Sequence, residues 1–268
     1  MQDLIGFEEF KEQGINIKKR RTAALIVAIV AVILVMLLGS PSYVEIMGEV
    51  IAQSDGEGFW GVLQAVLAII IVYIVAFYLI ISPVINAMIT ECDPKKYIGL
   101  TYYSEGKKAQ NISYSAGYFY MGEFEKSLEF AERELVASKK PYTELFYKAS
   151  CLFFLGRMEE FRSTVLELEA RLLNEPKKRA KARRSLGYLY LLLAISENDK
   201  EKIKKYRAAA EPIEKTAPNT AYLSYIKGVA AFCLKERNEA IYRFMSAKEM
   251  GSKAFFPAYV DVYLEKLN

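Results

Sequence analysis

The stretch FWGVLQAVLAIIIVYIVAFYLII, residues 59–81, decides the class of fold to which this chain belongs. Its 23 residues include one strongly polar side chain, Gln64, which lies near one end. As a helix rising about 1.5 Å per residue, the stretch would reach about 35 Å, enough to cross a bilayer with some tilt. Aromatic residues, which favour the headgroup level, lie towards both ends. The stretch therefore predicts a transmembrane helix, which Pro83 is expected to kink or end.

A second apolar stretch, TAALIVAIVAVILVMLL, occupies residues 22–38 without a charged side chain. It would reach about 26 Å, near the short limit for a membrane span. The alternative is that both stretches are buried core helices of a soluble protein. That alternative is disfavoured because neither stretch keeps a polar face. The sequence therefore predicts two transmembrane helices within residues 22–90.

Charged residues flank the two stretches unevenly. The cations before the first stretch are Lys11, Lys18, Lys19, Arg20 and Arg21. The connection 39–58 has no cation and four acids. The cations after the second stretch are Lys95, Lys96, Lys107 and Lys108. The positive-inside rule then predicts both chain ends in the cytoplasm and the acidic connection outside.

The expected location is a plasma membrane of bacterial type, which is consistent with the lack of a disulfide spacing and of a cleavable targeting region; the alternative is an organelle membrane. A cleaved signal peptide is the alternative for the first stretch, but no A-x-A site follows it. Residues 1–21 are then a basic segment, and residues 22–90 hold the two spans with their short acidic loop. Residues 91–106 form a juxtamembrane helix or linker, in which Asp93 and Pro94 resemble an N-cap and a first helical proline.

Residues 107–268 show helical periodicity with no alternating strand pattern, so the fold class is all-α. Gly122 and Gly156 each lie between two apolar helical segments, and they are 34 residues apart. A repeat of this length is typical of paired antiparallel helices joined by tight turns.

This part of the chain resembles the tetratricopeptide repeat (TPR) family. The residues at matching positions of the first unit are Tyr114, Tyr118, Gly122, Phe124, Ser127 and Ala131. Those of the second unit are Ala149, Gly156, Met158 and Phe161, and those of the last are Gly228, Ala240, Phe244 and Ala247. Lys235 replaces the turn glycine of the last unit, and a third unit with its turn at 196–199 departs from the period. The resemblance implies a TPR-like α-solenoid of about four helical hairpins, with 255–267 as a capping helix.

A TPR-like solenoid lines its concave face with the first helix of each pair, which implies a groove for a protein or peptide partner. The residues expected in this groove are Ile112, Phe119, Tyr120, Phe146, Phe153, Phe154, Lys181, Arg184, Tyr188, Tyr222, Tyr225 and Phe232. The alternative is that these rings are packed between repeats, or that the terminal helix occupies the groove.

A basic run after Pro176 places six cations in eight residues. They are Lys177, Lys178, Arg179, Lys181, Arg183 and Arg184. The run is interpreted first as a solvated helix face, because most charge runs are of this kind. The functional alternative is a site for an acidic partner or for anionic headgroups. Nucleic acid is not expected, because the net charge is only +4 and no binding motif accompanies the run.

The composition argues against an enzyme. The chain has no histidine, and Cys92, Cys151 and Cys233 lie far apart in sequence. No metal site, cofactor or catalytic residue is expected, since phosphate-binding loops and nucleophile elbows are also missing from the sequence. The predicted function is a membrane-anchored TPR-like adaptor that binds a protein partner at the cytoplasmic face. The alternative is an accessory subunit whose spans pack against a transporter or membrane enzyme, helped by small residues such as Ala23, Ala24, Ala28 and Ala31; homo-oligomerisation is compatible with either.

Overall fold

A computed structural model describes residues 2–38, 57–105, 111–138, 141–173 and 180–267. The described residues form one 3₁₀ helix and twelve α-helices and contain no strand, so the chain is all-helical there. The N-terminal elements are η1 (Gln2–Phe10), α1 (Lys11–Leu38), α3 (Glu57–Ile89) and α4 (Pro94–Glu105). The remainder are α5 (Asn111–Met121), α6 (Phe124–Ala137), α7 (Tyr142–Phe154), α8 (Met158–Leu173), α9 (Ala180–Ser196), α10 (Lys200–Ala209), α11 (Ala217–Cys233), α12 (Arg237–Met250) and α13 (Phe256–Leu267).

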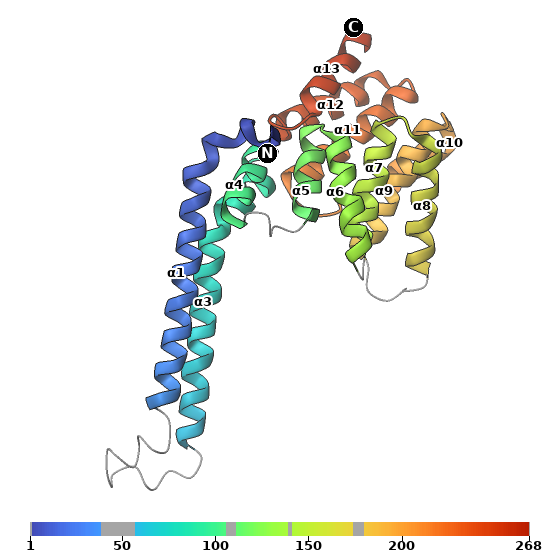
Figure 1. The fold of residues 1–268 in the computed structure, drawn as a ribbon. Helices are drawn as coiled ribbons and strands as arrows, with labels where there is room; N and C mark the ends of the chain where they lie inside the picture. The colour runs from blue at the N-terminus through green and yellow to red at the C-terminus, as the bar shows by residue number, and fades with distance from the viewer. Residues whose placement is uncertain (1, 39–56, 106–110, 139–140, 174–179, 268) are drawn as a thin grey trace, which may run out of the picture.

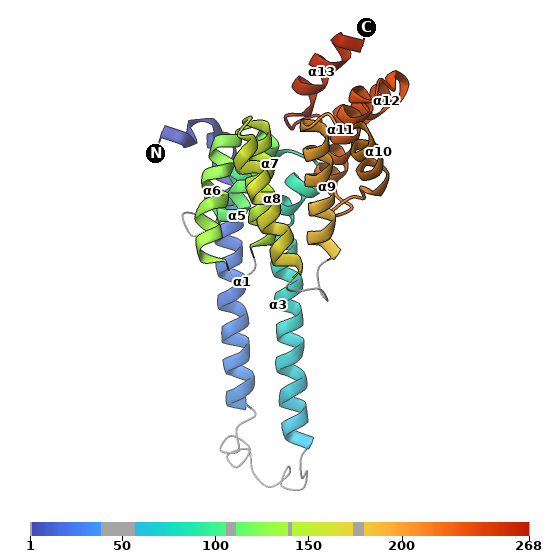
Figure 2. The same cartoon turned by 90° about the vertical axis from the view of Figure 1, so that its right-hand side faces the viewer.

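Helices α1 and α3 pack side by side as a long hairpin that projects from the rest of the molecule (Figures 1 and 2). Among the described residues, one helical segment, Leu63–Ile89, has the length and apolar composition needed to cross a membrane. Its most apolar window has no buried residue. The other expected span, residues 22–38 in α1, stays a prediction.

Pro83 does not end α3, so of the two effects expected from sequence, a kink or an end, the end is wrong. The helix continues through it to Ile89. Proline lacks the N–H that would bond to the carbonyl four residues earlier, which here belongs to Leu79. The Ser82 hydroxyl donates to that carbonyl at 2.9 Å, so the acceptor keeps a partner and the helix tolerates the proline.

The segment η1 and helix α4 form a small platform that joins the hairpin to the remaining helices. Helix α4 begins where expected, and the Asp93 carboxylate caps it by accepting from the Lys96 N–H at 3.0 Å. The segment η1 packs on α4, and Phe7 joins a cluster with Ile98, Tyr114 and Tyr118. The basic N-terminal segment is therefore folded against the platform over its described residues.

Helices α5 to α12 form four consecutive pairs, each closed by the same turn. The turn residues Gly122, Gly156, Asn198 and Lys235 all have left-handed backbone angles, with φ between 52° and 81°. At each turn, the N–H of this residue and the N–H of the next bond to carbonyls of the preceding helix, which is the Schellman arrangement. The lysine expected in place of a turn glycine thus adopts the glycine conformation.

The pairs stack in chain order and then close on themselves. The first helices contact each other in sequence, α5 with α7, α7 with α9, and α9 with α11, and α13 packs on α11 and α12. At the closure, the Phe255 N–H donates to the Tyr120 carbonyl at 2.9 Å. Rings of the first and last pairs also touch, with 5.2 Å between the centroids of Phe119 and Tyr222. The core therefore lies on the inner side of this closed stack.

Candidate functional site

The side chains expected to line an open groove lie instead inside the closed stack. They come from the first helices of the pairs, as the sequence indicated. The buried members are Phe119, Tyr120, Phe146, Tyr188, Tyr222 and Tyr225. The partly buried members are Phe153, Phe154, Arg184 and Phe232, and the side chains of Ile112 and Lys181 lie outside the described residues. These rings are therefore packed between the helix pairs, which was the alternative to an open groove.

Tyr222 lies at the centre of this interior. Its ring centroid is 5.2 to 6.5 Å from the centroids of six other rings, contributed by α5, α7, α9 and α13. An aromatic side chain buries about 150–250 Å² of surface, so an open groove of this composition would leave a large apolar area in water. Closing the stack removes that area, and Phe256 at the start of α13 completes the closure.

The interior also contains polar side chains, including a thiol and a tyrosine hydroxyl whose pKa values are raised by burial. Ser127 lies between Ser115 and Cys151, and its hydroxyl donates to the Ser115 carbonyl at 2.8 Å. The Cys151 thiol donates to the Ser127 hydroxyl at 3.2 Å. Burial raises the pKa of the Cys151 thiol to about 12, and burial likewise raises the pKa of the Tyr222 hydroxyl. Neither group ionises near neutral pH, so neither is poised as a nucleophile.

The thiol of Cys92, which follows the end of α3, is also buried and has a raised pKa. Burial, with a smaller contribution from Asp93, raises its pKa to about 12. Within the described residues, no three His, Cys, Asp or Glu side chains come together in a way that would hold a metal ion.

The basic run is only partly within the described residues. Lys177, Lys178 and Arg179 precede the start of α9 and lie outside the described residues. Arg183 is exposed on the first turn of α9, and Arg184 is partly buried beside it. The structure therefore does not bring the six cations together as one described surface.

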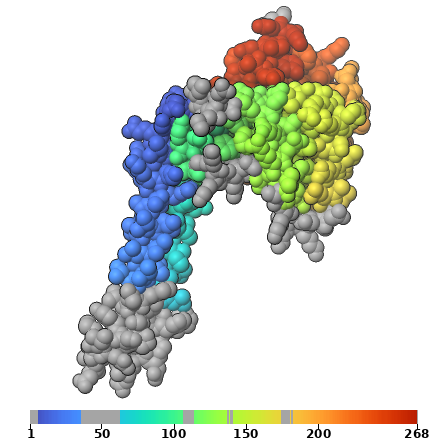
Figure 3. All heavy atoms as spheres, in the orientation of Figure 1, coloured from blue at the N-terminus to red at the C-terminus, as the bar shows by residue number. Residues whose placement is uncertain are grey.

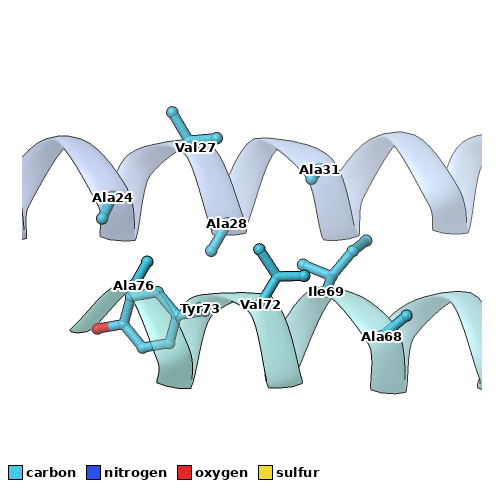
Figure 4. Close-up of a pocket in the computed structure, with 9 residues that line it drawn as sticks. All are labelled: Ala24, Val27, Ala28, Ala31, Ala68, Ile69, Val72, Tyr73 and Ala76. Carbon is cyan, nitrogen blue, oxygen red and sulfur yellow. The ribbon is translucent and has the colours of Figure 1, made fainter. Parts of the chain in front are cut away.

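An apolar groove runs between α1 and α3 (Figure 4). It has a volume of about 310 Å³. Its lining residues are Ala24, Val27, Ala28, Ala31, Ala68, Ile69, Val72, Tyr73 and Ala76. A second hollow of about 220 Å³ continues from it past Ala28 and Tyr73. Alanines on both helices keep side chains short where the groove lies, so another helix can approach closely.

Part of this groove was predictable from sequence. Ala23, Ala24, Ala28 and Ala31 were identified as a face able to pack closely. Ala24, Ala28 and Ala31 line the groove, whereas Ala23 is exposed and lies outside it. Ala68 and Ala76 on α3 were missed, although their separation of eight residues places them near one face of a helix. The register of α1 against α3, which also shapes the groove, depends on how the two helices pack and could not be predicted from either helix alone.

Comparison with protein-family models, with curated proteins and with solved structures gives no match for this chain.

Proposed function

We propose that this protein is a two-span membrane subunit that packs against a transmembrane partner through the groove of its hairpin. In this proposal α1 and α3 both cross the bilayer, and the TPR-like stack of helix pairs lies on the cytoplasmic side. The flanking cations support that orientation. This proposal corresponds to the accessory-subunit alternative, and it takes precedence because the apolar groove that is open lies in the hairpin.

One observation carries the proposal: the hairpin exposes its apolar side chains while the helix pairs bury theirs. Val27 on α1 and Leu79 on α3 are 68% and 69% exposed, and they have many apolar neighbours in the same condition. A contiguous apolar surface of this kind on a soluble protein is an interaction site or an aggregation liability. In a bilayer it faces lipid, and the alanine-lined groove is the place where a helix packs more closely than lipid does.

The adaptor function expected from the sequence remains a second candidate, with a different surface. The outer side of the stack exposes Tyr242 and Met245 on α12 and Val262 on α13. These side chains offer a soluble partner an apolar contact that does not require the closed interior to open.

The test is photo-crosslinking of the full chain in native membranes. A photoreactive residue at Val72, which lines the groove, is expected to form an adduct with a transmembrane protein. The matched control is Ile74, which is exposed but lies about 200° around the same helix and outside the groove. Ala28→Leu, which fills the groove, should abolish the Val72 adduct, whereas Val30→Leu on the exposed face should not.

Three outcomes would contradict the proposal. A Val72 adduct with lipid alone would show that no protein occupies the groove. Equal adducts from Val72 and Ile74 would show that the groove is not selective. An adduct with a second copy of this chain would replace the proposed foreign partner by a homo-oligomer.

A further inference from the structure

A polar hollow lies between α1 and α3 at the end of the hairpin that joins the rest of the molecule. Figure 3 shows this end in the darkest blue, where η1 and the start of α1 lie. The hollow has a volume of about 370 Å³, and none of its lining residues lines the alanine groove. Five of the lining residues are polar or charged: Glu9, Glu12, Gln13, Asn16 and Arg20.

The polar hollow lies where the apolar stretches of both helices end. Arg20 comes two residues before the stretch 22–38, and Ile80, on the opposite wall, is the next-to-last residue of the stretch 59–81. In the proposed function, this level is where the cytoplasmic headgroups of the bilayer begin. Glu12 comes eight residues before Arg20 on α1, which places it about 12 Å further along the helix towards the cytoplasm.

Two charged side chains of the polar hollow are available to a ligand. Among the described residues, neither Glu12 nor Arg20 has an ion-pair partner. Glu9 differs, because its carboxylate pairs with Lys95 of α4 at 2.8 Å. Glu12, Asn16 and Arg20 are spaced four residues apart, so they lie on one side of α1. The polar hollow therefore presents a carboxylate and a guanidinium with an amide between them.

The order of these groups matches the order of groups in a phospholipid that ends in an amine. From the bilayer outwards, such a lipid has acyl chains, a phosphate and an ammonium group. Along the hairpin, the apolar wall formed by Leu79 and Ile80 is followed by Arg20 and then by Glu12. A guanidinium suits a phosphate, and a carboxylate accepts hydrogen bonds from a primary ammonium, which has three N–H donors. The separation of about 12 Å leaves room for the phosphate and the ammonium in line.

Other abundant headgroups match the polar hollow less well. A glycerol headgroup has no cation for Glu12, so the carboxylate would meet only the negative charge of the lipid phosphate. A choline headgroup has a cation, but its quaternary nitrogen has no N–H to donate to the carboxylate. The charges therefore select for a primary amine as well as for a phosphate.

We propose that the polar hollow binds the headgroup of an aminophospholipid of the phosphatidylethanolamine class, with its phosphate at Arg20 and its ammonium at Glu12. This inference rests on the part of the proposed function that inserts α1 and α3 in a bilayer. The acyl chains leave past Leu79, which is 69% exposed, so the alanine groove stays free for a transmembrane partner. The lipid then lies beside the partner at the cytoplasmic end of the hairpin.

The test is native mass spectrometry of the full chain in mild detergent. The protein is offered phosphatidylethanolamine, phosphatidylcholine and phosphatidylglycerol in equal amounts, all with the same acyl chains. The adduct with phosphatidylethanolamine should be roughly fivefold more abundant than either of the others, as expected for charge pairs that remain partly exposed to solvent.

Variants of the two charged residues locate the site. Glu12→Gln and Arg20→Gln should each reduce the preference for phosphatidylethanolamine to near parity. The matched controls are Glu8→Gln and Lys19→Gln, which remove the same charges at exposed positions outside the polar hollow and should keep the preference. Glu12→Lys should reverse the preference towards phosphatidylglycerol, because two cations then face the lipid phosphate.

Several results would overturn the inference. Equal adducts with the three lipids would show that the headgroup is not recognised, and a preference for phosphatidylglycerol in the unaltered chain would show that the carboxylate plays no part. A preference lost equally in the control variants would place the lipid elsewhere. Displacement of the lipid by an equal concentration of water-soluble phosphoethanolamine would show that the ligand is a free phosphate compound and not a lipid.

The crosslinking experiment at Val72 separates this inference from the proposed function. A Val72 adduct with a transmembrane protein, found together with no lipid preference, would overturn the headgroup site and leave the proposed function intact. A preference for phosphatidylethanolamine without a Val72 protein adduct would support the headgroup site and overturn the proposed partner.

Discussion

The hairpin and the stack of helix pairs are both apolar and helical, but they place their apolar atoms on opposite sides. In the hairpin, aliphatic side chains such as Val27 face outwards and alanines lie between the helices. In the stack, rings such as Phe119 and Tyr222 are fully buried, and the charged side chains of its described part, except Glu144, are exposed or partly exposed. Apolar content alone therefore does not identify a core. Whether apolar side chains face inwards or outwards depends on whether water or lipid surrounds the helix.

The two regions should also differ in what stabilises them. Burial from water drives the packing of the stack, at about 25 cal/mol per Å² of apolar surface. That term is missing between helices in lipid, where acyl chains are as apolar as leucine and close packing of small residues holds helices together. Truncating an apolar side chain is therefore expected to cost far more in the stack than on the exposed side of the hairpin, which the proposed function places in lipid.

The largest expected effect is that of Phe119→Ala. Phe119 is fully buried and touches rings of both the first and the last pair, so its loss leaves a cavity at the closure. We expect the free energy of unfolding to fall by about 3–5 kcal/mol. The measurement is urea unfolding of the full chain in mild detergent, followed by near-ultraviolet circular dichroism of the tyrosines.

The matched variant in the hairpin is Leu67→Ala, at a position on α3 that is 55% exposed. It should change the same transition by less than about 1 kcal/mol, because detergent or lipid replaces the lost contacts. Equal losses from the two variants would break the comparison between the regions, since they would show that Leu67 is packed against protein.

A smaller effect is expected from added rather than removed volume. Gly228 lies where α11 meets α12, and a Cβ built there would be 2.6 Å from Phe244 Cδ1. Gly228→Val should lower the free energy of unfolding by roughly 1–3 kcal/mol, because the fully buried Phe244 has to move. The check is the same urea transition.

Gly187 in α9 supplies the control, since a Cβ there would meet no atom within 4 Å. Gly187→Ala should raise stability by roughly 0.5–1 kcal/mol, as expected for alanine in an open helical position. If Gly187→Ala lowered the free energy of unfolding as much as Gly228→Val, the loss at Gly228 could not be assigned to the close approach of α11 and α12.

The comparison of glycines also shows how far the sequence could lead. The helix pairs were predictable because turn glycines and small residues at helix contacts leave a local signal, as Gly122, Gly156 and Gly228 do. The turn at Lys235 could be placed only by analogy with its neighbours, because lysine carries no left-handed preference. The predicted end at Pro83 was wrong, because the neighbouring Ser82 supplies the hydroxyl that compensates for the proline; a kink there stays a prediction.

The groove was harder to predict because closure of the stack is not local. Aromatic residues at first-helix positions have the same spacing whether the stack stays open or closes. What closes it is a set of contacts between residues more than a hundred positions apart, such as Tyr120 with Tyr222 and with Phe256. Helical periodicity reports only neighbours along one helix, so it could name the rings but not say whether they face solvent.

The smallest expected effect concerns the joint between the two regions. Lys253, between α12 and α13, pairs with Asp93 at the start of α4, with 3.0 Å between Nζ and Oδ2. Met88 of α3 adds an apolar contact, because it belongs to the same buried cluster as Tyr222. Lys253→Met should lower the free energy of unfolding by less than about 1 kcal/mol, since the lysine side chain is 53% exposed and the pair is screened.

The pH dependence of the stability difference between wild type and Lys253→Met tests whether the ion pair with Asp93 causes it. The Asp93 carboxylate raises the pKa of Lys253 above its ordinary value of 10.5, so folding favours the protonated lysine. The pair therefore stabilises the fold from neutral pH, where Asp93 is ionised, up to that ordinary value, and its contribution is lost as pH rises through the raised pKa. The difference between wild type and Lys253→Met should be constant between about pH 6 and pH 9 and shrink only in stronger base. Buried tyrosines such as Tyr225, whose pKa is raised by burial, destabilise both proteins equally in base and so cancel from the difference. A difference that vanished already near neutral pH would show that another group holds the stack to the hairpin.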